Sequence, residues 1–182
     1  MRGKKLWIVQ CYITAFFSGN AQTGTIKVTG EYFGQKRPGR TAGVFAIGIV
    51  STDSIEHSSP AFSPDGKTVI WTKIFLGKPA FLVEMAEENG TWTAPHRPSF
   101  ADSSADDFYP SFSADGKKLY FSSRRPLPPC YPKLEDMWIW EVDRKSHGWG
   151  KPRPVDSTIM KGFEYAHSVS KKGTLFFSSR RP

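Results

Sequence analysis

Three stretches of the chain share one order of apolar and polar residues, in which a short alternating run leads through a polar turn into a second apolar run. The stretches are "SSPAFSPDGKTVIWT" (58–72), "DFYPSFSADGKKLYFSS" (107–123) and "FEYAHSVSKKGTLFFSS" (163–179). Alternation with a period of two is typical of a strand, and Asp-Gly favours a hairpin turn because glycine adopts positive φ at no steric cost. Each stretch therefore predicts a β-hairpin.

Two more apolar runs separate one hairpin from the next. "AFLVEMA" (80–86) and "DMWIWEVD" (136–143) predict third strands, and "TWTAP" (91–95) and "GWGKP" (148–152) predict short fourth strands. A unit of four antiparallel strands that recurs every fifty-odd residues is the signature of a β-propeller blade. A β-sandwich would not explain why successive hairpins share their sequence.

The predicted fold is all-β, an incomplete β-propeller of four-stranded antiparallel blades. Two blades are complete, at 57–100 and 108–156, and a third is partial, at 164–182. We expect residues 22–56 to form a lead-in that supplies an outer closing strand. Two blades and part of a third cannot close a ring. The sequence is therefore expected to be an N-terminal fragment of a longer propeller, or a half-propeller that closes by self-association.

The first 21 residues have the pattern of a secretory signal peptide. A basic start precedes a mostly apolar run over 6–17, and "SGNA" (18–21) supplies the small residues of a cleavage site. We therefore predict cleavage after Ala21 and export to the periplasm or the extracellular space. The alternative for the same run is a buried first strand. No apolar stretch is long enough to predict a membrane-spanning helix.

Charge and cysteine content narrow the classes of partner. The formal net charge is +8, and removal of the leader takes away its three basic residues. Beyond residue 5 no run of lysine and arginine exceeds two, so nucleic-acid binding is not indicated. The mature chain keeps one cysteine, Cys130, which excludes an internal disulfide.

The repeats resemble the TolB-like, WD-repeat-like propeller family, which is common in exported bacterial proteins. The motifs "PAFSPDGK", "YPSFSADGKKLYFSSRRP" and "DMWIWEV" carry the resemblance, and residues 31–51 are similar to the lead-in that precedes the first such repeat in secreted members. The chain departs from the family where Arg124 and Arg180 occupy the usual asparagine position. The third turn also lacks the aspartate. The family spans translocation factors, peptidase gates and carbohydrate-active enzymes, so the resemblance implies the fold and not one activity.

One set of polar residues recurs at the start of the predicted inner strands. Aligning the repeats by their turns puts His57, Asp107 and Glu164 at one position, with Glu56 and His167 close by. In a propeller this position faces the central channel at one rim. The residues could form a polar rim that binds a divalent metal, because imidazole and carboxylate groups are cation ligands. The alternative, which we favour, is that they are solvated residues of short loops, and no cofactor is required.

A second recurring position holds arginine. Arg125 and Arg181 follow the second strand of their repeats, and Asp136 opens a third strand. A charge-assisted pair between Arg125 and Asp136 would tie the intervening loop to its own blade. The alternative is an arginine rim for acidic ligands such as uronates or phosphates.

The sequence favours a non-catalytic, exported scaffold that binds a protein or a cell-envelope glycan. It contains no convincing Ser–His–Asp order, HExxH motif, Walker loop or GxGxxG motif. Two alternatives follow from the family resemblance. One is a carbohydrate-active enzyme similar to metal-assisted uronide lyases, and the other is the propeller of a peptidase whose catalytic part lies elsewhere.

Overall fold

The computed structural model describes residues 28–37, 39–53, 55–129, 131, 136–156, 158 and 162–180. The predicted signal peptide, Cys130 and Arg181 lie outside these residues. The described part is all-β apart from one short 3-10 helix, η1 (Glu31–Gly34). It contains no helix that is both long and apolar enough to cross a bilayer.

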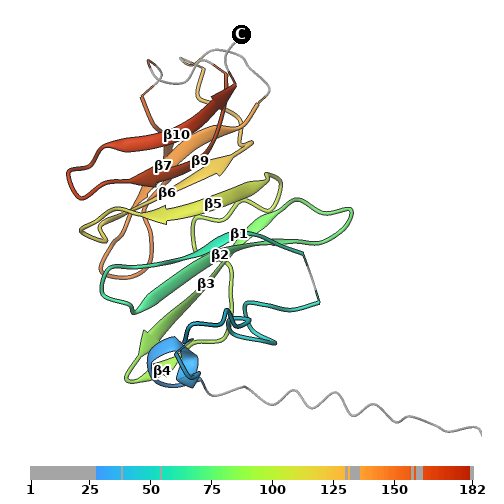
Figure 1. The fold of residues 1–182 in the computed structure, drawn as a ribbon. Helices are drawn as coiled ribbons and strands as arrows, with labels where there is room; N and C mark the ends of the chain where they lie inside the picture. Colours follow the sequence, from blue (N-terminus) through green and yellow to red (C-terminus); the bar gives the residue numbers. More distant parts are fainter. Residues whose placement is uncertain are drawn as a thin grey trace, which may run out of the picture.

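Three antiparallel sheets follow one another along the chain (Figure 1). The first has the order β1-β2-β3-β4, with β1 (Ile55–Phe62), β2 (Thr68–Ile74), β3 (Phe81–Glu88) and β4 (Thr91–Trp92). The second has the order β5-β6-β7-β8, with β5 (Asp107–Phe112), β6 (Lys118–Ser123), β7 (Trp138–Asp143) and β8 (Arg153–Pro154). The third is the hairpin of β9 (Phe163–Val169) and β10 (Leu175–Arg180). The sequential order within each sheet is that of a propeller blade.

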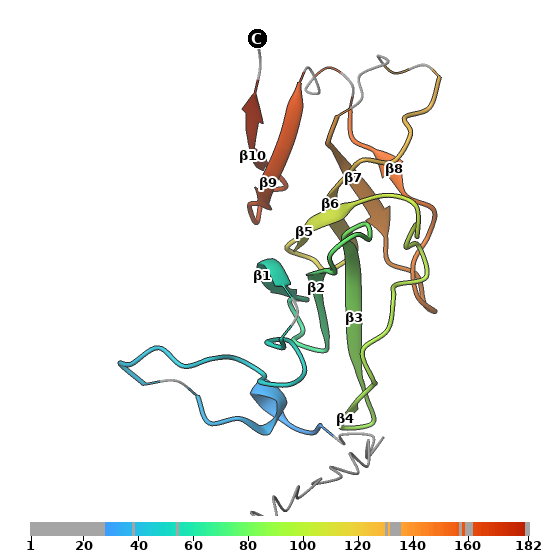
Figure 2. The same cartoon turned by 90° about the vertical axis from the view of Figure 1, so that its right-hand side faces the viewer.

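The blades stack through their first strands, because β1 contacts β5 and β5 contacts β9. The view in Figure 2 shows the three sheets arranged one beyond the next, without closure into a ring. The structure thus confirms the predicted fold class, an all-β, incomplete propeller of four-stranded antiparallel blades. It also places the three hairpin turns, between β1 and β2, β5 and β6, and β9 and β10, on one side of the stack (Figure 1).

The turns of the first two hairpins are held by the same side-chain bonds. The Ser63 hydroxyl donates to Asp65 Oδ1 and accepts the Thr68 amide, while the Lys67 amide donates to Asp65 Oδ1 at 3.0 Å. The second turn repeats each bond with Ser113, Asp115, Lys117 and Lys118. The hydroxyl donor lowers the pKa of both aspartates. The Ser-x-Asp-Gly-Lys sequence is therefore a turn with its own internal hydrogen-bond acceptor.

Each first strand contains a bulge. The pairing register shifts between His57 and Ala61 in β1 and between Phe108 and Ser111 in β5, and a third shift occurs where β9 meets β10. The residue after the last regular pair has a left-handed backbone in every case, with φ of 70° at Ser58, 52° at Tyr109 and 46° at Ala166. A bulge bends the strand and turns the next side chain, so these strands do not keep strict alternation.

The lead-in covers the outward face of the first blade. Four of its apolar residues are buried against Val69, Trp71, Val83, Met85 and Trp92. Phe33 meets the Trp92 ring edge-on at 4.6 Å and stacks on Phe45. Backbone pairing of the lead-in with β4 amounts to one bridge, between Thr29 and Thr91. The segment therefore occupies this face mainly through side-chain packing. Its ribbon lies next to the first sheet (Figure 2).

Truncation of Phe33 tests this packing. Phe33 is 7% exposed whereas Tyr32 is 44% exposed, and both have positive φ. We expect Phe33→Ala to lower the free energy of unfolding by about 3 kcal/mol or more, because a buried aromatic leaves a cavity. Tyr32→Ala is the matched control and should cost well under half as much. Urea denaturation measures both, and equal losses would contradict the proposed packing of the lead-in.

Candidate functional site

The inner strands of the two later blades begin with a carboxylate in the same place. Asp107 pairs with Ser123 across β5 and β6, and Glu164 pairs with Ser179 across β9 and β10. In the first blade the register gives this position to Glu56, which pairs with Lys73, and not to His57. The prediction that His57 occupies this position is wrong by one residue. It came from aligning the repeats at their turns, and the bulge of β1 contains one residue more than that of β5.

Asp107 is fully buried and bound by Arg125. The guanidinium reaches both carboxylate oxygens, with Nη2 at 2.7 Å from Oδ2 and Nε at 3.3 Å from Oδ1. Its Nη1 donates to the Phe100 carbonyl, and its Cζ lies 4.8 Å from the Phe121 ring centre. Burial raises the pKa of Asp107, and the hydrogen bonds and charge of Arg125 oppose that rise. The arginine thus provides a buried counter-charge and is not free to bind a ligand.

The expected pair between Arg125 and Asp136 is not formed among the described residues. The Asp136 carboxylate instead accepts the Met137 amide. Arg125 comes two residues after Ser123, whose neighbour on β5 is Asp107 and whose neighbour on β7 is Trp138. The carboxylate directly across the β5–β6 pair is therefore within reach of the guanidinium, whereas Asp136 lies beyond the paired part of β7.

The backbone of the same position joins each blade to the one before it. The Asp107 amide donates to the Ala80 carbonyl at 3.0 Å, and the Glu164 amide donates to the Met137 carbonyl at 3.1 Å. Glu164 is as buried as Asp107, and its Oε1 accepts the Ser179 hydroxyl at 2.9 Å. The position therefore links neighbouring blades through the backbone and fixes its own hairpin through the carboxylate.

The two histidines of the predicted rim lie within the stack of blades. The His57 ring packs against the rings of Phe108 and Tyr109, with centroids 5.2 and 5.0 Å apart. His167 on β9 is buried, and its Nδ1 is 3.5 Å from the Ser122 hydroxyl of the second blade. Burial lowers the pKa of His167 to about 4, so the ring is neutral at pH 7. Within the described ranges no three His, Cys, Asp or Glu side chains gather as a metal-binding group.

Two further contacts between blades were not predicted from the sequence. Trp149 Nε1 donates to both carboxylate oxygens of Glu84, at 3.0 and 3.2 Å, and burial raises the pKa of Glu84. Arg144 Nη2 donates to the Thr68 hydroxyl at 2.6 Å. No pattern along the chain identifies Glu84 as the acceptor of the Trp149 indole.

Three hollows of the described structure lie beside the hairpin turns. One, of about 540 Å³, lies between the first two turns and is lined by Pro64, Asp65, Asp115, Gly116, Lys117 and Arg144. A second, of about 610 Å³, lies between the second and third turns and includes Lys118, Tyr120, Lys171 and Lys172. A third, of about 700 Å³, adjoins the first turn and the lead-in. The turn side, defined as the side carrying these three hairpin turns, therefore has hollows that are large enough to receive part of another molecule.

Comparison with known proteins gives partial matches to solved structures. No protein-family model matches the chain, and no curated protein matches it. Among solved structures, TolB from Acinetobacter baumannii superposes with a TM-score of 0.45 at 20% identity over 67% of this chain and 26% of that chain. Kuenenia stuttgartiensis hydrazine synthase superposes with a TM-score of 0.46 at 20% identity, over 66% of this chain and 36% of that chain. The chain thus matches only a minor part of either protein.

Removal of Arg125 tests the buried pair. Arg125→Ala leaves the Asp107 carboxylate buried without its counter-charge, so we expect a loss of about 3 kcal/mol or more in the free energy of unfolding at pH 7. The loss should shrink towards pH 4, because protonated Asp107 needs no cation. Arg124→Ala removes a neighbouring, exposed arginine 3.8 Å from Asp106 and should cost less than about 1 kcal/mol. Denaturation curves that are alike for the two variants would refute the assigned role.

The buried imidazole predicts a specific pH dependence. A histidine whose folded pKa is about 4, against 6.5 when unfolded, gives stability that is present above pH 6.5 and is lost as pH falls towards 4. Between pH 4 and 6.5 this histidine alone changes the free energy of unfolding by up to about 1.4 kcal/mol per pH unit. His167→Leu should therefore flatten the acid side of the stability profile relative to wild type. The raised pKa values of Glu84 and Asp107 make the free energy of unfolding change with pH in the opposite direction. Both carboxylates are present in the variant and in wild type, so their effect cancels when the two profiles are compared.

His147→Leu removes an exposed histidine and is the matched control. It should leave the acid side of the profile as in wild type. If His167→Leu and His147→Leu give the same profile between pH 4 and 6.5, the fold does not lower the pKa of His167.

Proposed function

We propose that the protein is an exported β-propeller scaffold that binds a protein partner through its turn side. The observation that carries this proposal is the separation of two kinds of position in each repeat. The carboxylates at the start of the inner strands bind groups inside the fold, as Arg125 binds Asp107. The hairpin turns lie at the opposite ends of the same strands, with hollows between them.

The separation of buried titratable side chains from exposed turns favours a role in binding over a role in catalysis for the described residues. A general acid or base must reach the atom that it protonates or deprotonates, and a metal ligand must reach an ion. Asp107 and Glu164 are fully buried, and His167 is nearly so. The turns, in contrast, present exposed polar side chains in repeated geometry, which suits recognition by a partner that spans more than one blade.

Site-specific photo-crosslinking tests the proposal on the full chain in its own host. A photoreactive phenylalanine derivative at Ala114 or Lys171 should trap a discrete partner, because both residues are exposed on the turn side. The same group at Leu76 or Lys78, on the loop between β2 and β3 at the other end, is the control. Crosslinks from the control positions alone would overturn the assigned face. The N-terminal sequence of the mature protein tests export, with cleavage expected after Ala21.

A further inference from the structure

The turn of the third hairpin breaks the rule that the first two follow. Lys171 and Lys172 stand where the second repeat has Ala114 and Asp115. Ser170 still accepts the Thr174 amide through its hydroxyl, at 3.1 Å, and pairs with Thr174 through the backbone. The acceptor that holds the other two turns is replaced by an ammonium group. The third turn is one residue shorter, since Ser170 pairs with Thr174 whereas Ser113 pairs with Lys118. It therefore closes without the carboxylate, and position 172 can carry a positive charge.

The replacement changes the charge of the cleft beside it. The hollow between the first and second turns is lined by two carboxylates and two cationic side chains. The hollow between the second and third turns, named here the basic cleft, is lined by the cationic residues Lys117, Lys118, Arg144, Lys171 and Lys172 and by the carboxylates of Asp115 and Asp143. Equivalent positions in the stack therefore differ in charge, and the third turn accounts for the difference.

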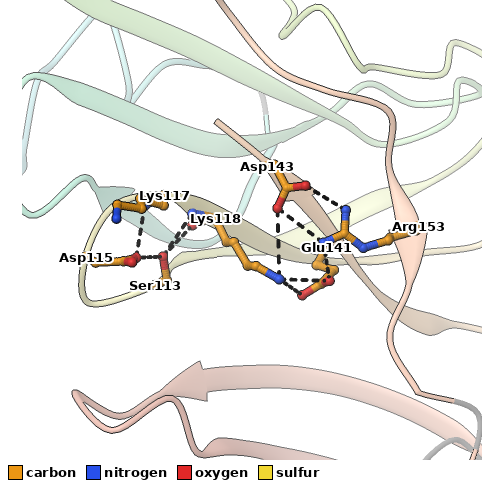
Figure 3. A network of polar contacts seen from close by, with 7 residues as sticks. All are labelled: Ser113, Asp115, Lys117, Lys118, Glu141, Asp143 and Arg153. Carbon is orange, nitrogen blue, oxygen red and sulfur yellow. Dashed lines mark hydrogen bonds and ion pairs between the residues drawn. The ribbon is translucent and has the colours of Figure 1, made fainter. Parts of the chain in front are cut away.

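Several of the charged side chains that line the basic cleft already have ion-pair or hydrogen-bond partners within the protein. The Lys118 ammonium lies 3.0 Å from Glu141 and 3.9 Å from Asp143, and Arg153 contacts the same two carboxylates (Figure 3). Asp115 accepts bonds from its own turn. Arg144 donates to Thr68.

The three lysines at the edge of the cleft are different. Lys117, Lys171 and Lys172 are exposed, and none has an ion pair with another described residue. They form a cationic edge around a hollow of about 610 Å³, in which the charge of Asp115 acts on Lys117 alone of the three. A surface of this kind attracts anions by long-range electrostatics.

We propose that the basic cleft binds an acidic peptide segment of the partner, one that carries several spaced aspartate or glutamate side chains. This inference rests on the proposed function and names the chemistry of the partner. Lysine ammonium groups on flexible stems suit separate carboxylates, whereas a compact phosphate is best held by an arginine fork. The arginine that lines the cleft is already bound to Thr68.

The aromatic content of the cleft distinguishes a peptide from an acidic glycan. Sugar rings bind on exposed aromatic faces, and Tyr120 is the aromatic residue among the lining side chains of the described structure. Tyr120 is partly buried and directed towards the His167 ring, with centroids 6.4 Å apart. It offers no open stacking platform, whereas Val169 and Ala114 provide small apolar contacts for a peptide.

Fluorescence anisotropy with the full chain tests the proposal. The probe is a labelled synthetic peptide in which glutamate alternates with serine, and an oligogalacturonate of equal charge and inorganic phosphate are the competitors. We expect the triple variant Lys117→Ala/Lys171→Ala/Lys172→Ala to bind the peptide roughly tenfold more weakly, since each exposed ion pair contributes a fraction of 1 kcal/mol. Binding by wild type should weaken as salt rises.

A control with the same change of net charge is the triple variant Lys36→Ala/Arg40→Ala/Lys78→Ala, whose residues are exposed elsewhere. It should alter binding less than about twofold. Equal losses in the two triple variants would show attraction by net charge only and would overturn the site. Stronger competition by oligogalacturonate or phosphate than by unlabelled peptide would overturn the peptide assignment.

One further substitution separates the turn's stability from its binding role. Lys172→Asp restores the aspartate of the other turns, so it should raise the melting temperature and weaken peptide binding at the same time. A substitution that weakened both would indicate a purely structural role for Lys172. If crosslinking identifies a partner at the turn side while the peptide fails to bind wild type, the scaffold function stands and the acidic-peptide inference fails.

Discussion

The stack of blades depends on one buried carboxylate position at the start of each later inner strand. At Asp107 and Glu164 the backbone amide donates to the residue just before the third strand of the preceding blade. The side chain bonds to a residue at the end of the second strand of its own blade, or just beyond it. Burying a charge is costly unless it is paired and fully hydrogen-bonded. The fold meets this cost at Asp107 with a bidentate arginine, so the same residue fixes both the shape of the hairpin and its attachment to its neighbour.

The repeat made most of the architecture predictable. Period-two alternation and Asp-Gly turns located the hairpins, and the recurrence every fifty-odd residues identified the blades. A motif that recurs in successive repeats is much less often a chance match than a motif that occurs once. The partners of individual charged groups were less predictable. The sequence predicts a pair between Arg125 and Asp136 that would tie the intervening loop to its blade, but pairing across β5 and β6 brings Asp107 to the guanidinium instead. Strand patterns predict which elements pair, while the register decides which side chains meet.

The bulges explain the remaining difference between the expected and observed sites. Counting residues back from the turn puts His57 with Asp107, yet the extra residue in the bulge of β1 moves Glu56 into that position. The left-handed residue inside each bulge is serine, tyrosine or alanine, none of which marks such a conformation in the sequence. The lead-in was hard to predict for a similar reason: it reaches the first blade by burying Phe33 and Ala46 in non-repetitive structure, with positive φ at both residues.

The two ends of each hairpin are under different physical constraints, and this difference bears on function. At the start of the inner strand, replacing the buried carboxylate by a residue of another charge would leave its buried partner without a counter-charge or hydrogen bond. Few residue types are therefore compatible with this position. At the turn, the carboxylate of Asp115 is exposed and holds only its own turn, so its replacement changes local order without disturbing the stack. Lys172 is such a replacement. The fold can therefore change the charge of its turn side one repeat at a time, while the interior that joins the blades stays the same.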